Sequence, residues 1–182
     1  MSRKITDTEL LANRFSKEQP LQIKVITLSD RAAQGVYEDK SGARLREIVE
    51  AFFATRAIPT KIHYTLLTDD PARLKDELFS ARNAGMHIVF TSGGTGVGPR
   101  DNTPEVVIEL ADKIIPGIME SIRMKYGVDK PCALLSRTVA ATMGDIVVYA
   151  LPGSTRGVEE YLSEILKSIE HLVCVLHGLD VH

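Results

Sequence analysis

Short apolar runs alternate with longer amphipathic segments along most of this chain, and the two patterns predict different elements. Compact runs rich in Ile, Val and Leu suit strands that are buried in a sheet, and they occupy 23–28, 61–67, 88–90 and 146–151. Between them, apolar residues recur at the spacing of a helix with one buried face, in the segments 45–53, 71–84, 104–111, 118–126 and a long one after 157. The segment 131–142 predicts a loop followed by a strand.

Strands that alternate with helices and are joined by short turns are typical of an α/β fold. We therefore predict one three-layer domain over 21–182, with a mostly parallel sheet, right-handed crossovers and helices on both faces. Residues 1–20 are polar and mixed in charge, with Leu10, Leu11 and Phe15 as the main apolar positions. They predict a loosely attached N-terminal arm.

Capping residues predict where two of the helices begin. Asp70 precedes Pro71 and is the natural N-cap of the helix that follows, whereas Ser41 is a reasonable cap for the helix before it. This interpretation leaves Asp69 at the end of its strand without a structural duty. The long C-terminal helix is expected to bury Val158, Tyr161, Leu162, Ile165, Leu166 and Ile169.

A glycine-rich turn follows the strand 88–90, and it contains Gly93, Gly94, Gly96 and Gly98, with Arg100–Asp101 after them. Thr103 is a plausible N-cap of the next helix, and Pro104 suits its first position. Backbone amides in such a turn can converge on an anion, and the helix dipole adds to the field.

Neither standard nucleotide fingerprint fits this turn. Pro99 stands where a dinucleotide-binding motif needs Gly or Ala, and no Gly-Lys-Ser/Thr follows for a P-loop. A simpler alternative is a tight turn that uses glycine for its dihedral angles. Four glycines with an attached Arg-Asp pair favour a binding site.

Four polar turns come at the ends of predicted strands, where ligands bind in parallel sheets. They are Ser29–Asp30, Asp69, the turn 93–101 and the loop 152–157. We expect all four to lie along one edge of the sheet and to form a single site.

Two glycine turns at helix starts suit two anionic groups, such as the phosphates of a nucleotide and of a second substrate. Arg100, Arg137 and Arg156 can add bidentate contacts to phosphate oxygens. Asp69 and Asp101 would repel phosphates unless a divalent cation lies between, which indicates Mg²⁺. The arrangement favours phosphoryl or nucleotidyl transfer.

Each of these residues also has a structural alternative. Asp101 can cap the helix after it, Asp30 can form an Asx-turn, and Ser136 can be a turn hydroxyl. Arg156 can be a solvated surface charge. His171, Cys174 and His177 recur every three residues, but packing of a helix end on the core is favoured there over a metal site.

Composition excludes several function classes. The formal net charge is −2 and no long basic run is present, so a nucleic-acid partner is not indicated. Cys132 and Cys174 lack the spacing of a zinc site or a disulfide framework, which favours the reducing cytoplasm. No apolar run reaches membrane-spanning length.

Several linked motifs resemble those of the MogA/MoaB family of molybdenum cofactor biosynthesis proteins. The central one runs from Thr91 to Gly96 and continues from Pro99 to Glu105. Flanking matches are the loop 28–39, Leu134–Leu135–Ser136–Arg137 and Leu151–Pro152–Gly153–Ser154. The resemblance covers roughly residues 21–170. The Arg100–Asp101 pair points to the MogA type, molybdopterin adenylyltransferase.

This resemblance implies a reaction in which the terminal phosphate of molybdopterin attacks the α-phosphate of Mg-ATP. It carries catalytic, Mg²⁺-associated roles onto Asp69 and Asp101. Substrate contacts to pterin or phosphate are implied for Ser29, Asp30, Gly93, Gly94, Thr95, Gly96, Arg100, Ser136 and Arg137. Nucleotide contacts are implied for Pro152, Gly153 and Ser154. The family further implies a homotrimer and a downstream molybdate-insertion enzyme. A non-catalytic, MoaB-like molybdopterin-binding or scaffold oligomer is the alternative.

Overall fold

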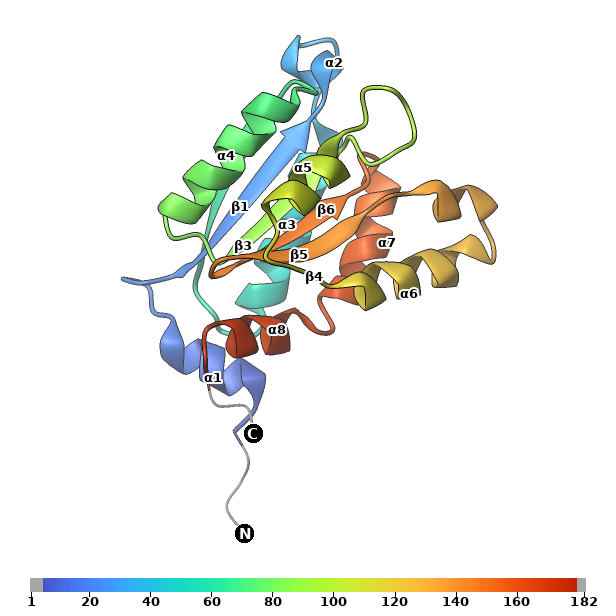
Figure 1. Ribbon diagram of the computed structural model, residues 1–182. Helices are drawn as coiled ribbons and strands as arrows, with labels where there is room; N and C mark the ends of the chain where they lie inside the picture. The colour runs from blue at the N-terminus through green and yellow to red at the C-terminus, as the bar shows by residue number, and fades with distance from the viewer. Residues whose placement is uncertain (1–4, 180–182) are drawn as a thin grey trace.

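The computed structural model describes residues 5–179, which form one six-stranded sheet between two layers of helices (Figure 1). The strands, in chain order, are β1 (Leu21–Leu28), β2 (Thr60–Leu67), β3 (Ile88–Ser92), β4 (Lys113–Ile114), β5 (Val139–Met143) and β6 (Ile146–Leu151). Their spatial order is β2-β1-β3-β6-β5-β4. The first four of these are parallel, while β5 and β4 are antiparallel to their neighbours. The predicted α/β fold with a mostly parallel sheet is confirmed. The short strand β4 was not predicted, because no apolar run marks it in the sequence.

Helices cover both faces of this sheet. They are α1 (Asp7–Arg14), α2 (Asp30–Ala33), α3 (Lys40–Ala54), α4 (Pro71–Asn83), α5 (Thr103–Leu110), α6 (Pro116–Gly127), α7 (Thr155–Ile165) and α8 (Ile169–Leu176), with a 3₁₀ turn η1 at Pro131–Leu135. Figure 1 shows α4 and α5 in front of the sheet and α3 behind it. The predicted three-layer arrangement is therefore present.

The central strands β3 and β6 are buried throughout and mostly apolar because helices cover both of their faces. In β3, Ile88 and Phe90 belong to the core beneath α3 and α7, whereas Val89 belongs to the core beneath α4 and α5. The same alternation holds in β6, where Tyr149 faces the first core and Val148 the second. These strands place the polar turns that follow them at one edge of the sheet.

Of the predicted helix caps, Asp70 is confirmed and two are wrong. Asp70 accepts hydrogen bonds from the amides of Ala72 and Arg73. Helix α3 is capped by Asp39 and not by Ser41, because the Asp39 carboxylate accepts from Gly42 N at 2.9 Å.

Thr103 is the first residue of α5 and not its cap. Its hydroxyl donates to the carbonyl of Gly93 at 2.9 Å, which anchors the helix to the glycine turn. Asn102 takes the N-cap position without a capping hydrogen bond from its side chain.

The predicted long C-terminal helix is divided into α7 and α8. The amides of Lys167 and Ser168 donate to the carbonyls of residues three positions earlier, so the last turn tightens and the helix ends. The predicted face is buried on both sides of the break, except that Leu166 is only partly buried. Cys174 is fully buried in α8, as expected for a helix end that packs on the core.

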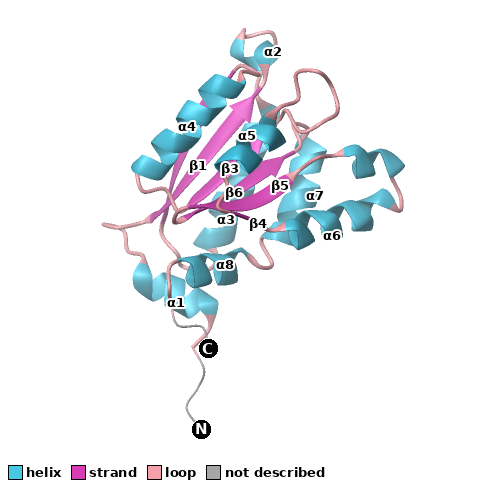
Figure 2. Cartoon of the chain, in the orientation of Figure 1, coloured by secondary structure: helices cyan, strands magenta, loops and turns pink. Residues whose placement is uncertain are grey.

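Helix α1 packs against α8 below the sheet (Figure 2), so the prediction of a loosely attached arm is wrong for the described part of 1–20. Leu11 is fully buried and Phe15 is 6% exposed. The Thr8 hydroxyl also donates to Glu170 of α8 at 2.8 Å. A few apolar residues are enough to hold the arm against the domain, because they pack on an apolar surface that the domain already presents. Residues 1–4 lie outside the described chain.

Candidate functional site

A cavity of about 920 Å³ opens at the edge of the sheet where the parallel strands end. All four of the predicted turns line it, with Ser29, Asp30, Asp69, Gly93, Gly94, Thr95, Gly96, Asp101, Pro152, Gly153 and Ser154 among the lining residues. The prediction that these turns meet at one edge is confirmed. The cause is topological, because parallel strands all direct their carboxyl ends to the same side.

Asp30 and Asp69 are joined by a reciprocal pair of hydrogen bonds across two neighbouring strand ends. The amide of Asp30 donates to the Asp69 carboxylate at 3.2 Å, and the amide of Asp69 donates to the Asp30 carboxylate at 3.1 Å. Asp69 therefore has a structural role that the sequence did not reveal, because it links two neighbouring strand ends. Asp30 begins the short helix α2, which Ser29 caps by accepting from Ala32 N.

The glycines of the central turn allow close approach of backbone to backbone. Gly93 has a φ of +112°, and a Cβ there would lie 2.2 Å from the carbonyl oxygen of Leu28. Its amide donates to Leu151 O at 3.1 Å and is not directed at a ligand. The amides of Gly94, Thr95 and Gly96 donate to no acceptor within the described chain. The predicted anion cradle is therefore reduced to these three amides.

Asp101 folds back onto the same turn. Its Oδ2 accepts from Gly98 N at 2.8 Å, so its carboxylate closes the turn and does not cap α5. A Cβ on Gly96 or Gly98 would lie within 3 Å of that oxygen. Glycine at these positions is what allows the carboxylate to reach the cavity wall.

Ser136 and Arg137 point in different directions, although they are neighbours. Ser136 has extended backbone dihedrals, which send successive side chains to opposite sides. Ser136 lines the cavity, and its Oγ is buried without a hydrogen-bond partner within the described chain. Arg137 does not line the cavity. Its Nε donates to Gly96 O at 2.7 Å.

The loop after β6 supplies the opposite wall. Ser154 caps α7 by accepting from Gly157 N at 3.1 Å, and the carbonyl of Pro152 accepts from Ser92 Oγ at 3.1 Å. Gly153 lies against Gly93, since a Cβ on Gly153 would be 3.1 Å from Gly93 Cα. The two glycine turns are thus packed on each other.

The loop between α2 and α3, with the first residue of α3, adds lining residues that were not among the predicted site residues: Tyr37, Asp39 and Lys40. The available signals were their place after the first strand and, for Tyr37 and Asp39, the resemblance of the loop 28–39 to the family. The hydroxyls of Tyr37 and Ser29 are 2.8 Å apart. Burial would raise the pKa of Asp39, but hydrogen bonds from Gly42 N and the Tyr64 hydroxyl lower it below its ordinary value. Burial and the bond to Asp39 raise the pKa of Tyr64 to about 12.

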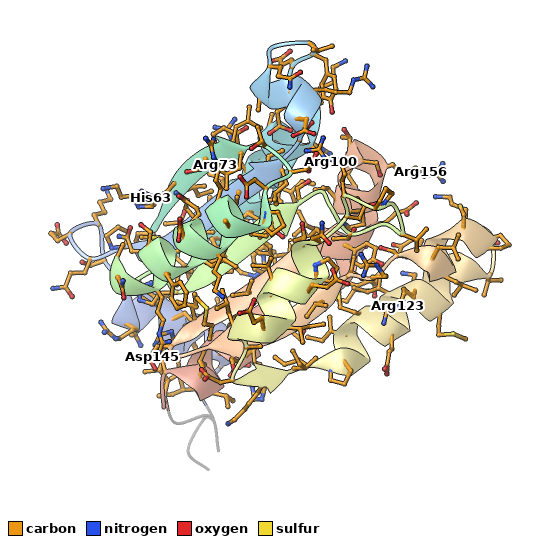
Figure 3. All side chains as sticks on the ribbon, turned by 45° about the horizontal axis from the view of Figure 1, so that its top comes forward. His63, Arg73, Arg100, Arg123, Asp145 and Arg156 are labelled. Atoms are coloured by element: carbon orange, nitrogen blue, oxygen red, sulfur yellow. The ribbon has the colours of Figure 1, made fainter. Side chains whose placement is uncertain are left out.

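Of the predicted phosphate-binding arginines, neither Arg100 nor Arg156 lines the cavity. Arg100 is 67% exposed and forms an ion pair with Asp30. Figure 3 shows Arg100 at the same end of the sheet as α2, while Arg156 lies over α7. Arg156 pairs with Glu160 on its own helix and is mostly exposed, which fits the solvated-charge alternative.

The two carboxylates that the sequence associates with Mg²⁺ satisfy a chemical test of fit. Both line the cavity, and each keeps its Oδ1 without a hydrogen-bond donor within residues 5–179. That stretch contains no cluster of three or more His, Cys, Asp or Glu suited to a metal. Carboxylate oxygens are the ligands that Mg²⁺ takes from proteins, one or two at a time, with water and substrate phosphates completing its shell.

Comparisons with known proteins give the family of this chain. Residues 24–171 match the family described as "Probable molybdopterin binding domain". The chain is 32% identical over 161 residues to the molybdopterin adenylyltransferase of Helicobacter pylori (strain J99), covering 88% of this chain and 90% of that protein. It is 34% identical over 160 residues to the enzyme of that name from Escherichia coli K12, covering 87% and 80%.

Solved structures agree. The molybdopterin biosynthesis enzyme MoaB from Thermus thermophilus superposes with a TM-score of 0.78 at 32% identity, covering 87% of this chain and 97% of that one. The chain therefore belongs to the MogA/MoaB family of molybdenum cofactor biosynthesis proteins. None of its described helices is long and apolar enough to cross a membrane.

Proposed function

We propose that this protein is a molybdopterin adenylyltransferase that transfers AMP from Mg-ATP to the terminal phosphate of molybdopterin. The observation that carries the proposal is the meeting of Asp69, Asp101 and two packed glycine turns in one cavity. Relatives named for this activity, 32% and 34% identical over most of the chain, support it.

In the proposed reaction an oxygen of the molybdopterin phosphate bonds to the α-phosphorus of ATP. The bond from that phosphorus to the bridging oxygen breaks, and pyrophosphate leaves. The attacking oxygen is already ionised, so no general base is required. This suits a cavity whose described lining residues include no histidine. Catalysis then depends on positioning and on neutralising charge.

Asp69 and Asp101 would hold Mg²⁺ through their free Oδ1 atoms, where the ion would neutralise charge between the carboxylates and the substrate phosphates. Ser29, Asp30 and Ser136 would contact the pterin. The buried, unpartnered hydroxyl of Ser136 supports its part in this set.

The free amides of Gly94, Thr95 and Gly96 would bind phosphate, and Gly93 would support them by holding the turn against β6. Pro152, Gly153 and Ser154 would contact the nucleotide near the start of α7, where the helix dipole favours anions. Arg100 would act at the rim, where its exposed guanidinium can exchange Asp30 for a phosphate.

We also propose a homotrimer in the cytoplasm, with the product passed to a molybdate-insertion enzyme. The support for assembly is that exposed apolar side chains recur in this part of the chain: Met124 on α6, Val128 directly after it, and Leu134 and Leu135 on η1. Exposed apolar surface of this kind favours a contact with another chain. Free thiols at Cys132 and Cys174 suit a reducing compartment.

The test is to mix purified protein, molybdopterin and Mg-ATP and to measure adenylylated product and pyrophosphate. Asp101→Asn keeps an oxygen that accepts from Gly98 N but loses the charge. We expect kcat to fall roughly a hundredfold to a thousandfold, while molybdopterin binding stays close to wild type.

The matched control is Asp112→Asn. The Asp112 carboxylate also accepts from a glycine amide, that of Gly144, but it lies outside the cavity. This variant is expected to keep full activity. Product formation by the Asp101 variant at the wild-type rate contradicts the role assigned to Asp101. Absence of product with the wild-type protein contradicts the proposed function and favours a non-catalytic molybdopterin-binding oligomer.

A further inference from the structure

Arg137 is bound to the glycine turn at several points. Besides the bond from Nε to Gly96 O, its Nη2 donates to the carbonyl of Asp101 and its Nη1 to the carboxylate of Glu105 on α5. The amide of Arg137 donates to Thr95 O at 2.9 Å. One residue shortly before β5 thus holds three carbonyls of the turn.

Few other polar contacts tie the segment 95–101 to the rest of the protein. The bonds between Gly98 and Asp101 are internal to the segment. Among hydrogen bonds and ion pairs within the described chain, the other tie is the ion pair of Arg100 with Asp30. Arg100 is 67% exposed, and exposed ion pairs contribute little to stability. The position of the segment therefore depends mainly on Arg137.

We propose that Arg137 is a positioning residue that holds the Asp101 carboxylate at the wall of the cavity, an inference that rests on the proposed function. A guanidinium is planar and its donors form a rigid fork, so its bonds to Gly96 O and Asp101 O fix these carbonyls relative to each other. The Asp101 carboxylate itself packs against Gly96 and Gly98 of the same turn.

This role differs from the substrate contact that the family resemblance implies for Arg137. Arg137 is not among the residues that line the cavity, and each of its three side-chain nitrogens donates to a carbonyl or carboxylate oxygen of the turn or of α5. Charge-assisted bonds of this kind are among the stronger hydrogen bonds in proteins. One N–H group on each of Nη1 and Nη2 remains, on a side chain that lies outside the cavity lining.

The experiment compares Arg137→Lys with wild type in steady-state turnover and in molybdopterin binding. Lysine keeps the charge but has no fork, so it cannot hold both carbonyls. We expect kcat to fall roughly a hundredfold, as for a misplaced catalytic group, with KM for ATP and Kd for molybdopterin unchanged. Weakened molybdopterin binding with unchanged kcat would overturn the proposal in favour of a substrate contact.

A second measurement is hydrogen exchange in the absence of substrate, which does not depend on the proposed activity. In Arg137→Lys, the amides of Gly98 and Thr103 are expected to exchange faster, while those of β3 and β6 keep wild-type protection. Wild-type exchange across 94–103 overturns the positioning role. If wild type transfers no AMP, the proposed function fails, and the exchange result still decides whether Arg137 orders the turn.

Two controls separate this effect from general damage. Glu105→Gln removes the charge of one partner of Arg137 but keeps the bonds of Arg137 to Gly96 and Asp101, so wild-type kcat is expected. A loss equal to that of Arg137→Lys would overturn the proposal, since the ion pair to α5 would then be what matters. Arg123→Met removes an arginine that donates to Thr138, next to Arg137, but not to the turn. Wild-type exchange across 94–103 is expected there, and faster exchange would contradict the specific role of Arg137.

Discussion

The two ends of the sheet bury polar groups in opposite ways. At the carboxyl ends of the strands, backbone amides hold the charged carboxylates of Asp30, Asp69 and Asp101 beside an open cavity. At the amino ends, the rings of His87 and His177 are 5.1 Å apart, and Phe15 of the arm packs edge-on against His87. Figure 3 shows Asp145 at this second end, far from Arg100.

Desolvation has different consequences at the two ends. Burial lowers the pKa of His87 to about 4, with a further contribution from His177, and burial also lowers the pKa of His177. In both rings burial favours the neutral imidazole. At the first end, Asp69 and Asp101 each keep an oxygen without a donor within the described chain. The second end also has a cavity, of about 420 Å³, and His177 Nε2 is buried there without a partner within the described chain. What distinguishes the first end is therefore the meeting of carboxylates with the free amides of a glycine turn beside its cavity.

The largest expected effect comes from removing charge at the first end. Asp69→Asn retains an oxygen that accepts from Asp30 N, so the strand ends stay joined, but the metal-associated charge is lost. We expect kcat to fall about a thousandfold at most, with little change in the unfolding free energy. Asp70→Asn is the neighbouring control, because Asp70 caps α4. Equal losses in both variants would mean that the effect is structural.

A second test compares glycines at the two ends of β3. Gly93→Ala places a Cβ 2.2 Å from the carbonyl oxygen of Leu28 and should destabilise the protein by about 4 kcal/mol or more. Gly85→Ala also has a positive φ, but it meets open space and should cost only about 1 kcal/mol. Denaturant unfolding measures both. Similar losses of unfolding free energy in the two variants would show that the close approach of Gly93 to Leu28 does not add to the dihedral strain.

A third test weakens the second end without touching the first. Leu11→Ala removes a fully buried side chain of α1 and is expected to destabilise the protein by about 3 kcal/mol. Turnover per folded molecule should be unchanged, since the arm lies away from the cavity. Ile5→Ala is the matched control, because Ile5 is 56% exposed. If Leu11→Ala left the unfolding free energy nearly unchanged, the prediction of a loosely attached arm would be correct after all.

The smallest effect is a pH dependence of stability at the second end. His87 is neutral in the folded protein down to about pH 4, whereas an ordinary histidine takes up a proton near 6.5. The unfolded chain therefore binds more protons in this window, and the unfolding free energy falls as pH drops from 6.5 towards 4. In His87→Asn, whose Oδ1 takes the place of the Nδ1 that accepts from Gln22 N, the slope should be shallower. An identical slope in the variant and in wild type would show that His87 does not cause this pH dependence.

Much of the fold could be predicted because its signals are local. The apolar runs of β1, β3 and β6 follow from burial on both faces, and Asp70 before Pro71 marks the start of α4. Errors arose where two local solutions were close. Asp39 and Ser41 can both cap α3, and in the folded chain Asp39 takes this place, where the Tyr64 hydroxyl also donates to its carboxylate at 2.7 Å. The break between α7 and α8 was hidden because both helices bury a continuous apolar stripe.

The candidate site divides in the same way. Local patterns were enough to identify which turns carry carboxylates and glycines, and a parallel sheet then brings those turns to one edge. The use of each group depends on residues far away in the chain. Asp69 meets Asp30 across 39 positions, and Arg137 meets Gly96 across 41. No local period encodes such contacts, so which oxygens stay free, where Arg137 points and how the arm docks emerge only once the chain is folded.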